Sequence, residues 1–528
     1  MSLNPKSVNL HELQKHSSSS SCWIIVDKKV WDITSFLESH PGGPEIILQY
    51  AGNDATTAYN EVHAPSIIST TLDSGKLVGY VTDDDLASLP KIDKPTASPD
   101  QPLPAPESES IGKPYTKPPL ETIINAYDFE EVCSRTISEK AKAFYMSAAT
   151  DLITHQMNSK IYSKILFRPR VLRPVRDTGT SSSILGIPTS LPVFVAPAAM
   201  ARLAHPDGEL ALARGAKAEG ILQVISTNAS YPLREIVESI SNSSSPHPWF
   251  LQLYVNRNRK QTEDLLTEAV KLGVRGIFLT VDCPVAGKRE ADERLAHDIS
   301  MKAPISGGGS QKSSDAKGGG LARMMGLYID SNLQWSDIPW IAKSLIQGQQ
   351  AAGVKTDKQI PIVIKGVQTA ADARFALQYE KYGVKSVFLS NHGGRSLDTS
   401  PPAILTLLEC WKVCPEIFEK LEVYVDGGIH RGTDVVKALS LGATAVGVGR
   451  PFLYSLAYGK DGVQKLVNIF QDEAKVTMQM LGVNSIGQLH PGLINTRGID
   501  HLVPDTNDYL GDDPRHPYAG RRRLLAKL

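Results

Sequence analysis

The sequence reads Ser390-Asn391-His392-Gly393-Gly394-Arg395-Ser396-Leu397-Asp398 directly after the apolar run Ser386-Val387-Phe388-Leu389. The run predicts a short buried strand that ends where the histidine begins. Two glycines allow a tight turn because they carry no Cβ atom. A base beside a fixed cation at the carboxyl end of a buried strand suits the removal of a proton from a carbon next to a carboxylate. Alone, the segment fits a surface loop with an incidental histidine equally well.

The rest of the large part of the chain alternates predicted strands with predicted helices, after an opening helical region at residues 120–152. The predicted strands are Val193–Ala196, Gln223–Ser226, Phe250–Val255, Gly276–Val281, Pro361–Lys365, Ser386–Ser390, Glu422–Val425 and Ala445–Val448. Eight parallel βα units close into a TIM (β/α)8 barrel, an α/β fold whose chemistry lies at the carboxyl ends of the strands.

Polar residues follow most of these strands. They are Ser226, Asn228, Gln252, Tyr254, Thr280, Asp282, Lys365, His392, Arg395 and Asp426, with Arg289 in the loop after strand four. Strand one is the exception, because it is followed by the apolar residues Ala198, Ala199 and Met200. Polar groups at the ends of buried strands cost free energy unless they are satisfied. One or two have structural explanations, but so many at one rim favour a bound polar ligand.

The last two strand ends resemble a phosphate cradle. Strand seven runs into Asp426-Gly427-Gly428, and strand eight into Gly447-Val448-Gly449-Arg450. Glycines let backbone N–H groups approach a ligand, and barrels commonly bind phosphate after strands seven and eight. Lys365 suits the N1–O2 edge of a flavin ring, where a cation stabilises the anionic reduced form.

Residues 8–82 predict a separate, smaller unit. Two short strands flank a turn at Asp27-Lys28-Lys29, and a helix begins near Thr34 and ends at His40-Pro41-Gly42-Gly43. A second histidine, His63, follows among short helical segments. Two neutral imidazoles approaching from opposite sides can hold a haem iron as axial ligands. Either histidine alone would be read as a solvated surface residue.

With the His-Pro-Gly-Gly motif and the second histidine together, this unit resembles the cytochrome b5 family over its whole length. The resemblance implies a small α+β domain whose haem b has His40 and His63 as its two axial ligands. Such a six-coordinate haem passes single electrons and leaves no open iron position for substrate or oxygen.

Three segments have a composition typical of loops and tethers. Residues 83–118 are rich in Pro, Ser, Asp and Glu, which predicts an extended linker between the small unit and a large unit at 119–500. Residues 291–325 contain two glycine runs and predict a mobile loop near the mouth of the active site. Residues 501–528 form a polar, Arg-rich tail without a clear amphipathic period.

The stretch Ser390–Arg395 with Leu397-Asp398 is a specific motif, and residues 125–490 resemble the FMN-dependent (S)-2-hydroxy-acid oxidase/dehydrogenase family. The resemblance makes His392 the catalytic base and Asp282 its orienting partner. It implies that Arg395 and Arg289 hold the substrate carboxylate with the help of Tyr145, and that Tyr254 contacts the substrate hydroxyl. It assigns Ala199 and Asn228 to the substrate side-chain pocket. The implied FMN-binding residues are Ala198, Ser226, Gln252, Thr280, Lys365, Asp426, Gly427, Gly428, Gly449 and Arg450.

Three positions depart from the family's pattern. His430 stands where relatives have the first arginine of Asp-Gly-Gly-Val-Arg-Arg, a flavin-phosphate ligand. Ala148 replaces the usual glycine after Ser147. Asn228 stands where relatives place Leu or Trp against the substrate side chain, so its amide either turns outward, binds protein or water, or meets a polar substrate group.

Charge and cysteine content limit the remaining classes. Lys+Arg 56 balances Asp+Glu 56, so nothing favours a nucleic-acid partner, and no apolar run is long enough to predict a transmembrane helix. The five cysteines form no Cys-x-x-Cys pair, which predicts reduced thiols in an intracellular protein and no zinc site. In relatives the tail helps to assemble a tetramer, so a homotetramer is expected.

Together the two units imply an enzyme that oxidises an (S)-2-hydroxy acid, L-lactate first among them, to the 2-oxo acid. Electrons would pass from FMN to haem b and then to an external acceptor such as cytochrome c. The alternative is an oxygen-using, peroxide-forming oxidase with a non-essential haem unit. A catalytically dead haem-binding redox sensor would need losses at His392, Arg395, Asp282 or Tyr254, and none is missing.

The last three residues, Ala526-Lys527-Leu528, are a close variant of the Ser-Lys-Leu peroxisomal address. A peroxisomal protein would not meet mitochondrial cytochrome c. The mitochondrial intermembrane space and the cytoplasm are therefore the alternative compartments.

Overall fold

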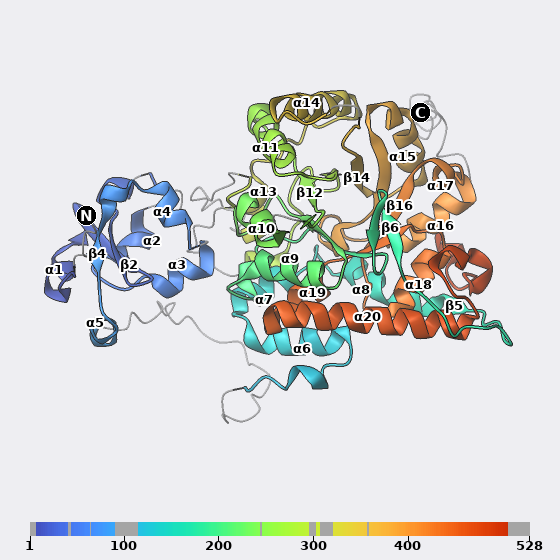
Figure 1. The fold of residues 1–528 in the computed structure, drawn as a ribbon, viewed down its shortest axis with the longest axis horizontal. Helices are drawn as coiled ribbons and strands as arrows, with labels where there is room; N and C mark the ends of the chain where they lie inside the picture. The colour runs from blue at the N-terminus through green and yellow to red at the C-terminus, as the bar shows by residue number, and fades with distance from the viewer. Residues whose placement is uncertain are drawn as a thin grey trace, which may run out of the picture. The chain divides into compact units, whose positions relative to one another are not determined.

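The computed structural model describes residues 7–37, 39–40, 44–63, 65–89, 115–242, 245–294, 303–306, 320–355 and 358–504. The chain forms two compact units that divide between Pro118 and Pro119. Pro41, Gly42 and Gly43 of the haem motif and the C-terminal Ala526-Lys527-Leu528 lie outside the described residues. Figure 1 labels helices and strands of both units and colours the chain by residue number.

The small unit is built on a four-stranded antiparallel sheet in the order β1-β2-β3-β4. Its strands are β1 (Ser17–Ser18), β2 (Ser21–Val26), β3 (Lys29–Asp32) and β4 (Leu77–Tyr80). Its helices are α1 (Leu10–Lys15), α2 (Pro44–Leu48), α3 (Thr56–Val62), α4 (Ile67–Thr71) and α5 (Asp83–Ser88). The β2–β3 hairpin turns at Asp27 and Lys28, both with positive φ, which suits the twist of a tight hairpin.

Two expectations for this part of the chain are wrong. The helix expected from Thr34 is a single 3₁₀ turn, Thr34–Phe36. The Thr34 hydroxyl donates to Asp32 instead of capping a longer helix. The extended linker does not begin at residue 83, because Thr82 caps helix α5 in a capping box with Asp85. Leu86 and Leu89 then pack on the core of the small unit, and such apolar side chains hold the segment in place.

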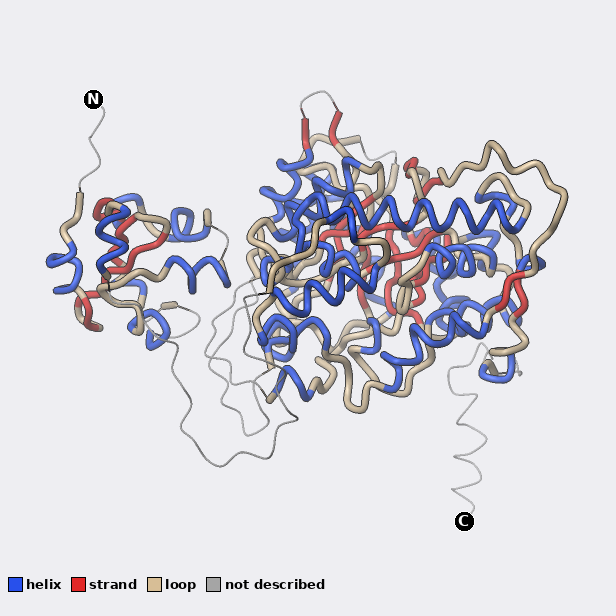
Figure 2. The backbone as a smooth tube through the Cα atoms, turned by 90° about the horizontal axis from the view of Figure 1, so that it is seen from below, coloured by secondary structure: helices blue, strands red, loops and turns tan. Residues whose placement is uncertain are grey.

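The large unit contains a closed barrel of eight parallel strands, as the sequence predicts. The barrel order is β12-β13-β14-β15-β16-β17-β8-β9. The strands are β8 (Val193–Val195), β9 (Leu222–Ile225), β12 (Phe250–Leu253), β13 (Ile277–Thr280), β14 (Ile362–Val367), β15 (Val384–Leu389), β16 (Glu422–Val425) and β17 (Ala445–Val448). In Figure 2 the strands lie in the middle of this unit and the helices surround them.

Aromatic side chains fill the barrel interior. Phe194, Phe250, Phe278, Phe388 and Tyr424 are each fully buried and contact one another mostly edge to face. A hairpin of β6 (Ser182–Ile184) and β7 (Ile187–Thr189) joins the same core. The N–H of Leu185 in its turn donates to Glu422, the first residue of β16, so the hairpin covers the amino end of the barrel. Only the carboxyl end is left for a ligand.

Helices surround the barrel and also precede it. The helices after the strands are α9 (Gly208–Ala218), α10 (Leu233–Ile240), α11 (Arg259–Lys271), α12 (Glu290–Glu293), α13 (Leu321–Gly326), α14 (Ile338–Ala351), α15 (Ala370–Phe375), α16 (Ala403–Val413), α17 (Ile417–Lys420), α18 (Gly432–Ser440), α19 (Arg450–Ser455) and α20 (Gly459–Leu481). Those before it are α6 (Ala126–Thr136), α7 (Glu139–Met146) and α8 (Ile153–Lys160). Short two-stranded pairs are β5 (Leu166–Phe167) with β18 (Ile494–Asn495), and β10 (Ser241–Asn242) with β11 (Ser245–Pro246).

The predicted mobile loop at 291–325 is wrong at both of its ends. Helix α12 occupies the first residues and helix α13 the last ones. Asp292 accepts a hydrogen bond from the N–H of Ala322 at 3.0 Å, and Arg323 pairs with Glu293 at 3.1 Å. These contacts tie the two ends together. Residues 295–302 and 307–319 lie outside the described part.

Among the described residues no helix is long and apolar enough to cross a membrane. All five cysteines are free and buried, as expected of reduced thiols.

Asp398, the last residue of the signature stretch, anchors the segment that leads into helix α8. Its carboxylate accepts hydrogen bonds from the hydroxyl of Thr150 and from the N–H groups of Asp151, Ile153 and Thr154. Burial alone would raise the pKa of Asp398, but these donors outweigh it and lower the pKa to about 2. The carboxylate is therefore charged at neutral pH and holds α8 against the barrel.

We predict that Asp398→Ala lowers the free energy of unfolding of the large unit by about 2–4 kcal/mol, because buried donors lose a charged acceptor. Denaturant titration followed by tryptophan fluorescence measures this. Asp151→Ala, which removes an exposed carboxylate from the same segment, is the matched control and should change little. Equal losses in both variants would show that Asp398 does not anchor α8.

Candidate active site

A cavity of ≈ 210 Å³ opens at the carboxyl ends of the barrel strands. The residues expected at the site that line it are Tyr145, Ala198, Ala199, Ser226, Asn228, Gln252, Tyr254, Thr280, Arg289, Lys365, His392, Arg395, Asp426, Gly427, Gly428, Gly449 and Arg450. Asp282 lies behind His392 and does not line the cavity. His40 and His63 belong to the small unit.

The backbone after β15 positions the histidine. His392, Gly393 and Gly394 have φ of 59°, 65° and 76°, so three successive residues adopt the left-handed conformation. A Cβ atom on Gly394 would lie 2.7 Å from the backbone nitrogen of His155, which excludes any other residue there. A left-handed histidine is strained, and such strain persists only where the surroundings enforce it.

His392 and Asp282 form a hydrogen-bonded pair. His392 Nδ1 lies 2.9 Å from Asp282 Oδ1, and the Asp282 side chain is fully buried. The carboxylate accepts the proton on Nδ1, so Nε2 carries the free lone pair. Burial alone would lower the pKa of His392, but electrostatic interactions with the neighbouring Cys283 and Asp282 raise it to about 9. His392 is therefore a stronger base than an ordinary histidine.

Two tyrosines stand near this base in different roles. The hydroxyl of Tyr254 lies 3.5 Å from His392 Nε2, too far for a strong hydrogen bond. Burial raises the pKa of Tyr254 well above its ordinary value, so it remains a hydroxyl. The hydroxyl of Tyr145 donates to the carbonyl of Met200 at 2.6 Å, so this tyrosine's proton is already engaged.

Three arginines converge on the cavity, and none of them pairs with a carboxylate among the described residues. Arg395 donates to the carbonyls of Phe144, Tyr145 and Ser147 at the end of α7. Burial and the neighbouring charges of Arg289 and Arg450 lower the pKa of Arg395. Buried guanidinium groups that repel one another favour binding of an anion.

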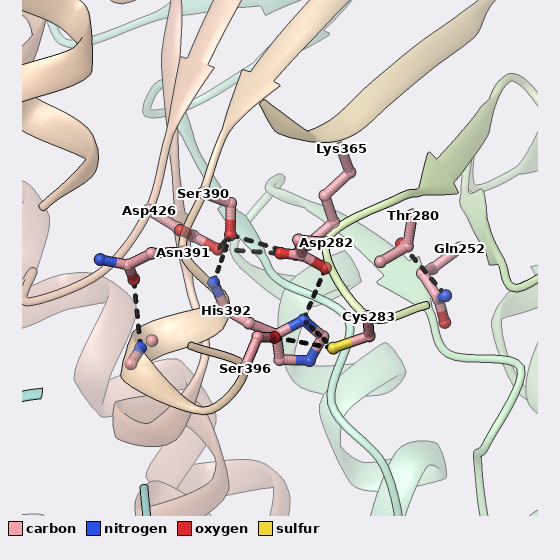
Figure 3. A network of polar contacts seen from close by, with 12 residues as sticks. Gln252, Thr280, Asp282, Cys283, Lys365, Ser390, Asn391, His392, Ser396 and Asp426 are labelled. Atoms are coloured by element: carbon pink, nitrogen blue, oxygen red, sulfur yellow. Dashed lines mark hydrogen bonds and ion pairs between the residues drawn. The ribbon is translucent and has the colours of Figure 1, made fainter. Parts of the chain in front are cut away.

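A second polar group lies between the ends of β14, β15 and β16 (Figure 3). The ammonium of Lys365 donates to Ser390 Oγ at 3.2 Å and lies 3.7 Å from Asp282 and 4.0 Å from Asp426. Burial alone would lower the pKa of Lys365, but the two carboxylates raise it. Ser390 Oγ also donates to Asp426 Oδ2 at 2.9 Å. Asp426 Oδ1 is buried without a hydrogen-bond donor, so it is free to accept one from a ligand.

A line of hydrogen bonds joins the ends of β9, β12 and β13. The side chain of Gln252 donates to Thr280 Oγ1 and accepts from the hydroxyl of Ser226 and the N–H of Thr227. A flavin ring needs such fixed donors and acceptors along its edge and a cation near N1. With Lys365 and the free oxygen of Asp426, the residues present fit FMN.

At the far end of the cavity Arg450 is held by its own contacts. It donates to the carbonyl of Gly393 at 2.6 Å and to His155 Nδ1 at 2.9 Å. Burial lowers the pKa of His155 to about 4, so this imidazole is neutral and can accept that bond. No sequence pattern indicated His155, because it lies on α8, outside the barrel strands and nearly 300 positions from Arg450.

The glycines of the expected phosphate cradle differ in what surrounds them. A Cβ atom on Gly428 would lie 1.9 Å from the carbonyl oxygen of Asn158, so Gly428 is required by the packing of α8. No atom stands within 4 Å of the position of a Cβ on Gly449, which lines the open cavity. His430 stacks on Tyr127 with ring centroids 4.9 Å apart and hydrogen-bonds the carbonyl of Gly428 through Nδ1.

Asn228 has a partner within the protein. The hydroxyl of Tyr328 donates to Asn228 Oδ1 at 3.0 Å. Tyr328 was not among the residues expected at the site, because it lies 100 positions along the chain from Asn228. The amide oxygen that the sequence left unassigned is thus satisfied by a tyrosine beside helix α13.

In the small unit the rings of His40 and His63 lie 6.2 Å apart, centroid to centroid, at 74°. Metal–imidazole bonds of about 2 Å put two ring centroids roughly 6 Å apart across one ion. The pair therefore fits axial ligation of a haem iron. The core of this unit, which includes Trp31 and Leu37, supplies apolar surface.

Family models match both units of the chain. A model of FMN-dependent dehydrogenases matches residues 133–496, and a model of cytochrome b5-like haem/steroid-binding domains matches residues 9–82.

Individual relatives cover different parts of the chain. An L-lactate dehydrogenase (cytochrome) of Saccharomyces cerevisiae is 38% identical and covers 94% of this chain and 80% of its own. Glycolate oxidase 3 of Oryza sativa subsp. indica is 36% identical and covers 74% of this chain and 98% of its own. The solved flavin-binding domain of baker's yeast flavocytochrome b2 superposes with a TM-score of 0.62 at 38% identity, covering 74% of this chain and 92% of that domain.

Proposed function

The chain belongs to the FMN-dependent dehydrogenase family and carries a cytochrome b5-like haem domain, and from this premise we propose that it is an L-lactate dehydrogenase of the flavocytochrome b2 type. It oxidises an (S)-2-hydroxy acid, L-lactate first among them, to the 2-oxo acid. Haem b and then cytochrome c receive the electrons. The observation that carries the proposal is the His392–Asp282 pair facing a cavity with three guanidinium groups that have no carboxylate partner among the residues the structure describes.

The protein's own residues bind the substrate and move its proton. Arg395 and Arg289 bind the carboxylate, because two planar guanidinium groups suit it better than ammonium groups. Tyr254 contacts the substrate hydroxyl, and Tyr145 supports the carboxylate site. His392 Nε2 accepts a proton, and Asp282 stabilises the imidazolium that results. In a carbanion route this proton comes from the α-carbon, and in a hydride route it comes from the hydroxyl. In both routes Nε2 accepts it.

When bound, FMN supplies a two-electron acceptor and haem b a one-electron carrier. We assign Lys365, Gln252, Ser226, Thr280 and Ala198 to the flavin ring. The residues assigned to the ribityl and phosphate groups of FMN are Asp426, Gly427, Gly428, Gly449 and Arg450. His40 and His63 are the proposed haem ligands.

The second candidate is an oxygen-using, peroxide-forming oxidase with a non-essential haem unit. Glycolate oxidase 3 matches 74% of the chain, whereas the cytochrome-linked relative matches 94%. The haem-coupled function is favoured because both candidate ligands, His40 and His63, are present and face each other.

Several expectations stay predictions. The domain limits of 8–82 and 119–500 enclose the matched ranges of 9–82 and 133–496. The homotetramer stays a prediction that rests on the family resemblance. For the compartment, a cytochrome c acceptor favours the mitochondrial intermembrane space, whereas Ala526-Lys527-Leu528 favours the peroxisome.

The experiment that separates the two functions is His63→Ala. The variant should lose its low-spin b-type spectrum and reduce cytochrome c only at background rate, while L-lactate still reduces the flavin. His11→Ala, an exposed histidine of the same unit, is the control. If cytochrome c reduction survives, or oxygen is the faster acceptor in the unmodified protein, the oxidase is the better assignment.

Replacing the base tests the chemistry. His392→Gln should slow anaerobic flavin reduction by about 10²–10⁴-fold, the usual contribution of a general base, while FMN stays bound. Stopped-flow absorbance measures the rate, and the flavin spectrum of the gel-filtered protein measures retention. Near-normal rates would transfer the role of base to another residue.

The pH dependence should follow the same residue. Only neutral His392 accepts a proton, so kcat/KM should rise with pH, with a midpoint above the ordinary 6.5 and toward about 9. Asp282→Asn removes a charge that stabilises the imidazolium, so the rise should shift to lower pH as its amplitude falls. A midpoint that Asp282→Asn leaves in place would assign the titration to a different group.

Asn228 is proposed to shape the substrate side-chain pocket, which accepts lactate and tolerates a larger or more polar 2-hydroxy acid. Asn228→Leu should favour lactate over such an acid by about 1–3 kcal/mol in relative kcat/KM, the range of one pocket contact. Tyr328→Phe removes the hydrogen bond but keeps the amide, so its shift should be smaller. Unchanged ratios in Asn228→Leu would mean that this side chain does not contact substrate.

A further inference from the structure

Cys283 is a cavity residue that the proposed reaction does not use. It follows Asp282 directly, after the end of β13, and is 7% exposed at the cavity wall. Its sulfur lies 3.4 Å from His392 Nδ1 and 2.8 Å from Ser396 Oγ (Figure 3). The other four cysteines are buried and do not line this cavity.

Cys283, Asp282 and His392 together form a set of metal-ligand atoms. The sulfur, one carboxylate oxygen and one imidazole nitrogen all lie within 4.8 Å of one another. No other group of three such residues occurs in the described part of the chain. The second carboxylate oxygen of Asp282 is buried and receives no hydrogen bond.

The spacing suits a tetrahedral ion. Zinc bonds of about 2.0–2.3 Å separate neighbouring ligand atoms by roughly 3.3–3.8 Å. In this structure Nδ1 lies 3.4 Å from the sulfur and 2.9 Å from Asp282 Oδ1. Small side-chain movements would therefore admit the ion, and its fourth position would be left for water or for the substrate.

We propose that Asp282, Cys283 and His392 form a binding site for zinc or a similar divalent cation, and that this cation switches off the catalytic base. The carboxylate and a thiolate balance the two positive charges of the ion. Lys365, 3.7 Å from Asp282, opposes it. Binding is therefore reversible and weaker than in a closed structural zinc site.

The switch follows from the two nitrogens of one imidazole. Without the ion, Nδ1 carries the proton that Asp282 accepts, and Nε2 is free to accept the substrate's proton. When the ion takes the lone pair of Nδ1, that proton moves to Nε2, and the thiol releases its proton to solvent. Nε2 is then an N–H donor and cannot act as a base. The loss of activity rests on the proposed role of His392, whereas binding of the ion does not.

The test uses the full-length holoenzyme with FMN and haem bound, freed of metal by dialysis against a chelator. Equilibrium dialysis with zinc measures binding, and anaerobic stopped-flow measures flavin reduction by L-lactate. Zinc should slow flavin reduction at least 10-fold, and chelator should restore it, with FMN and haem retained. Cys283→Ala and Cys283→Ser should bind one zinc fewer per chain at matched concentration. For each variant, inhibition by zinc is measured relative to that variant's own zinc-free rate. The inhibition constant for zinc should rise by more than about 10–100-fold, which is the effect of losing a residue that only orients a metal ligand.

Cys410→Ala is the matched control, because Cys410 is buried on α16 and does not line the cavity. It should stay as sensitive to zinc as the unmodified enzyme. If the Cys283 variants bound as much zinc as the unmodified enzyme and were equally inhibited by it, the proposed site would be wrong. Zinc bound through Cys283 without slower flavin reduction would overturn the switch. If zinc binding depended on Cys283 but no 2-hydroxy acid reduced the flavin, the zinc site would be supported and the proposed function would be wrong.

Discussion

The buried charge of Asp282 is the constraint on which the active end of the barrel depends. An ionised carboxylate without solvent exposure is unfavourable unless cations or donors compensate for it. Here the compensation comes from His392 on one side and Lys365 on the other. Because Lys365 lies on β14 and His392 follows β15, the carboxylate fixes β13, β14 and β15 relative to one another. It also sets the tautomer of the histidine, and so decides which nitrogen faces the cavity.

The aromatic interior makes this arrangement possible. Five large rings fill the barrel from strands on all sides, and the β6–β7 hairpin covers its amino end. Polar groups at the carboxyl end therefore stand on a rigid, closely packed base. Helix α8 completes this rim, since Asn391 and Asn158 hydrogen-bond each other through both of their amide groups. The signature stretch thus supplies the proposed base, the proposed substrate cation and two anchors for the helix beside them.

The two units divide the redox work between different kinds of site. The barrel offers an enclosed cavity with convergent cations, which suits a small anionic substrate and a flavin. The small unit offers two neighbouring imidazoles beside an apolar core, which suits electron transfer and leaves no position for substrate. This division is the physical basis for assigning substrate chemistry to one unit and electron delivery to the other.

The sequence by itself determined the eight strands and the residues at their ends, because periodicity and the residues that terminate strands are local properties. It also determined the histidine pair of the small unit, through a motif of four consecutive residues. Local composition wrongly predicted irregular structure at residues 83–89, where a capping box starts a helix. It was also wrong at the ends of the 291–325 loop, which a hydrogen bond between Asp292 and Ala322 ties together. Local patterns likewise gave no sign that Tyr328 bonds Asn228, that His155 bonds Arg450, or that Cys283 lies beside His392. Each of these contacts joins residues about 100 or more positions apart. Only closure of the barrel brings such residues together, so the tertiary structure alone decided which side chains share the site.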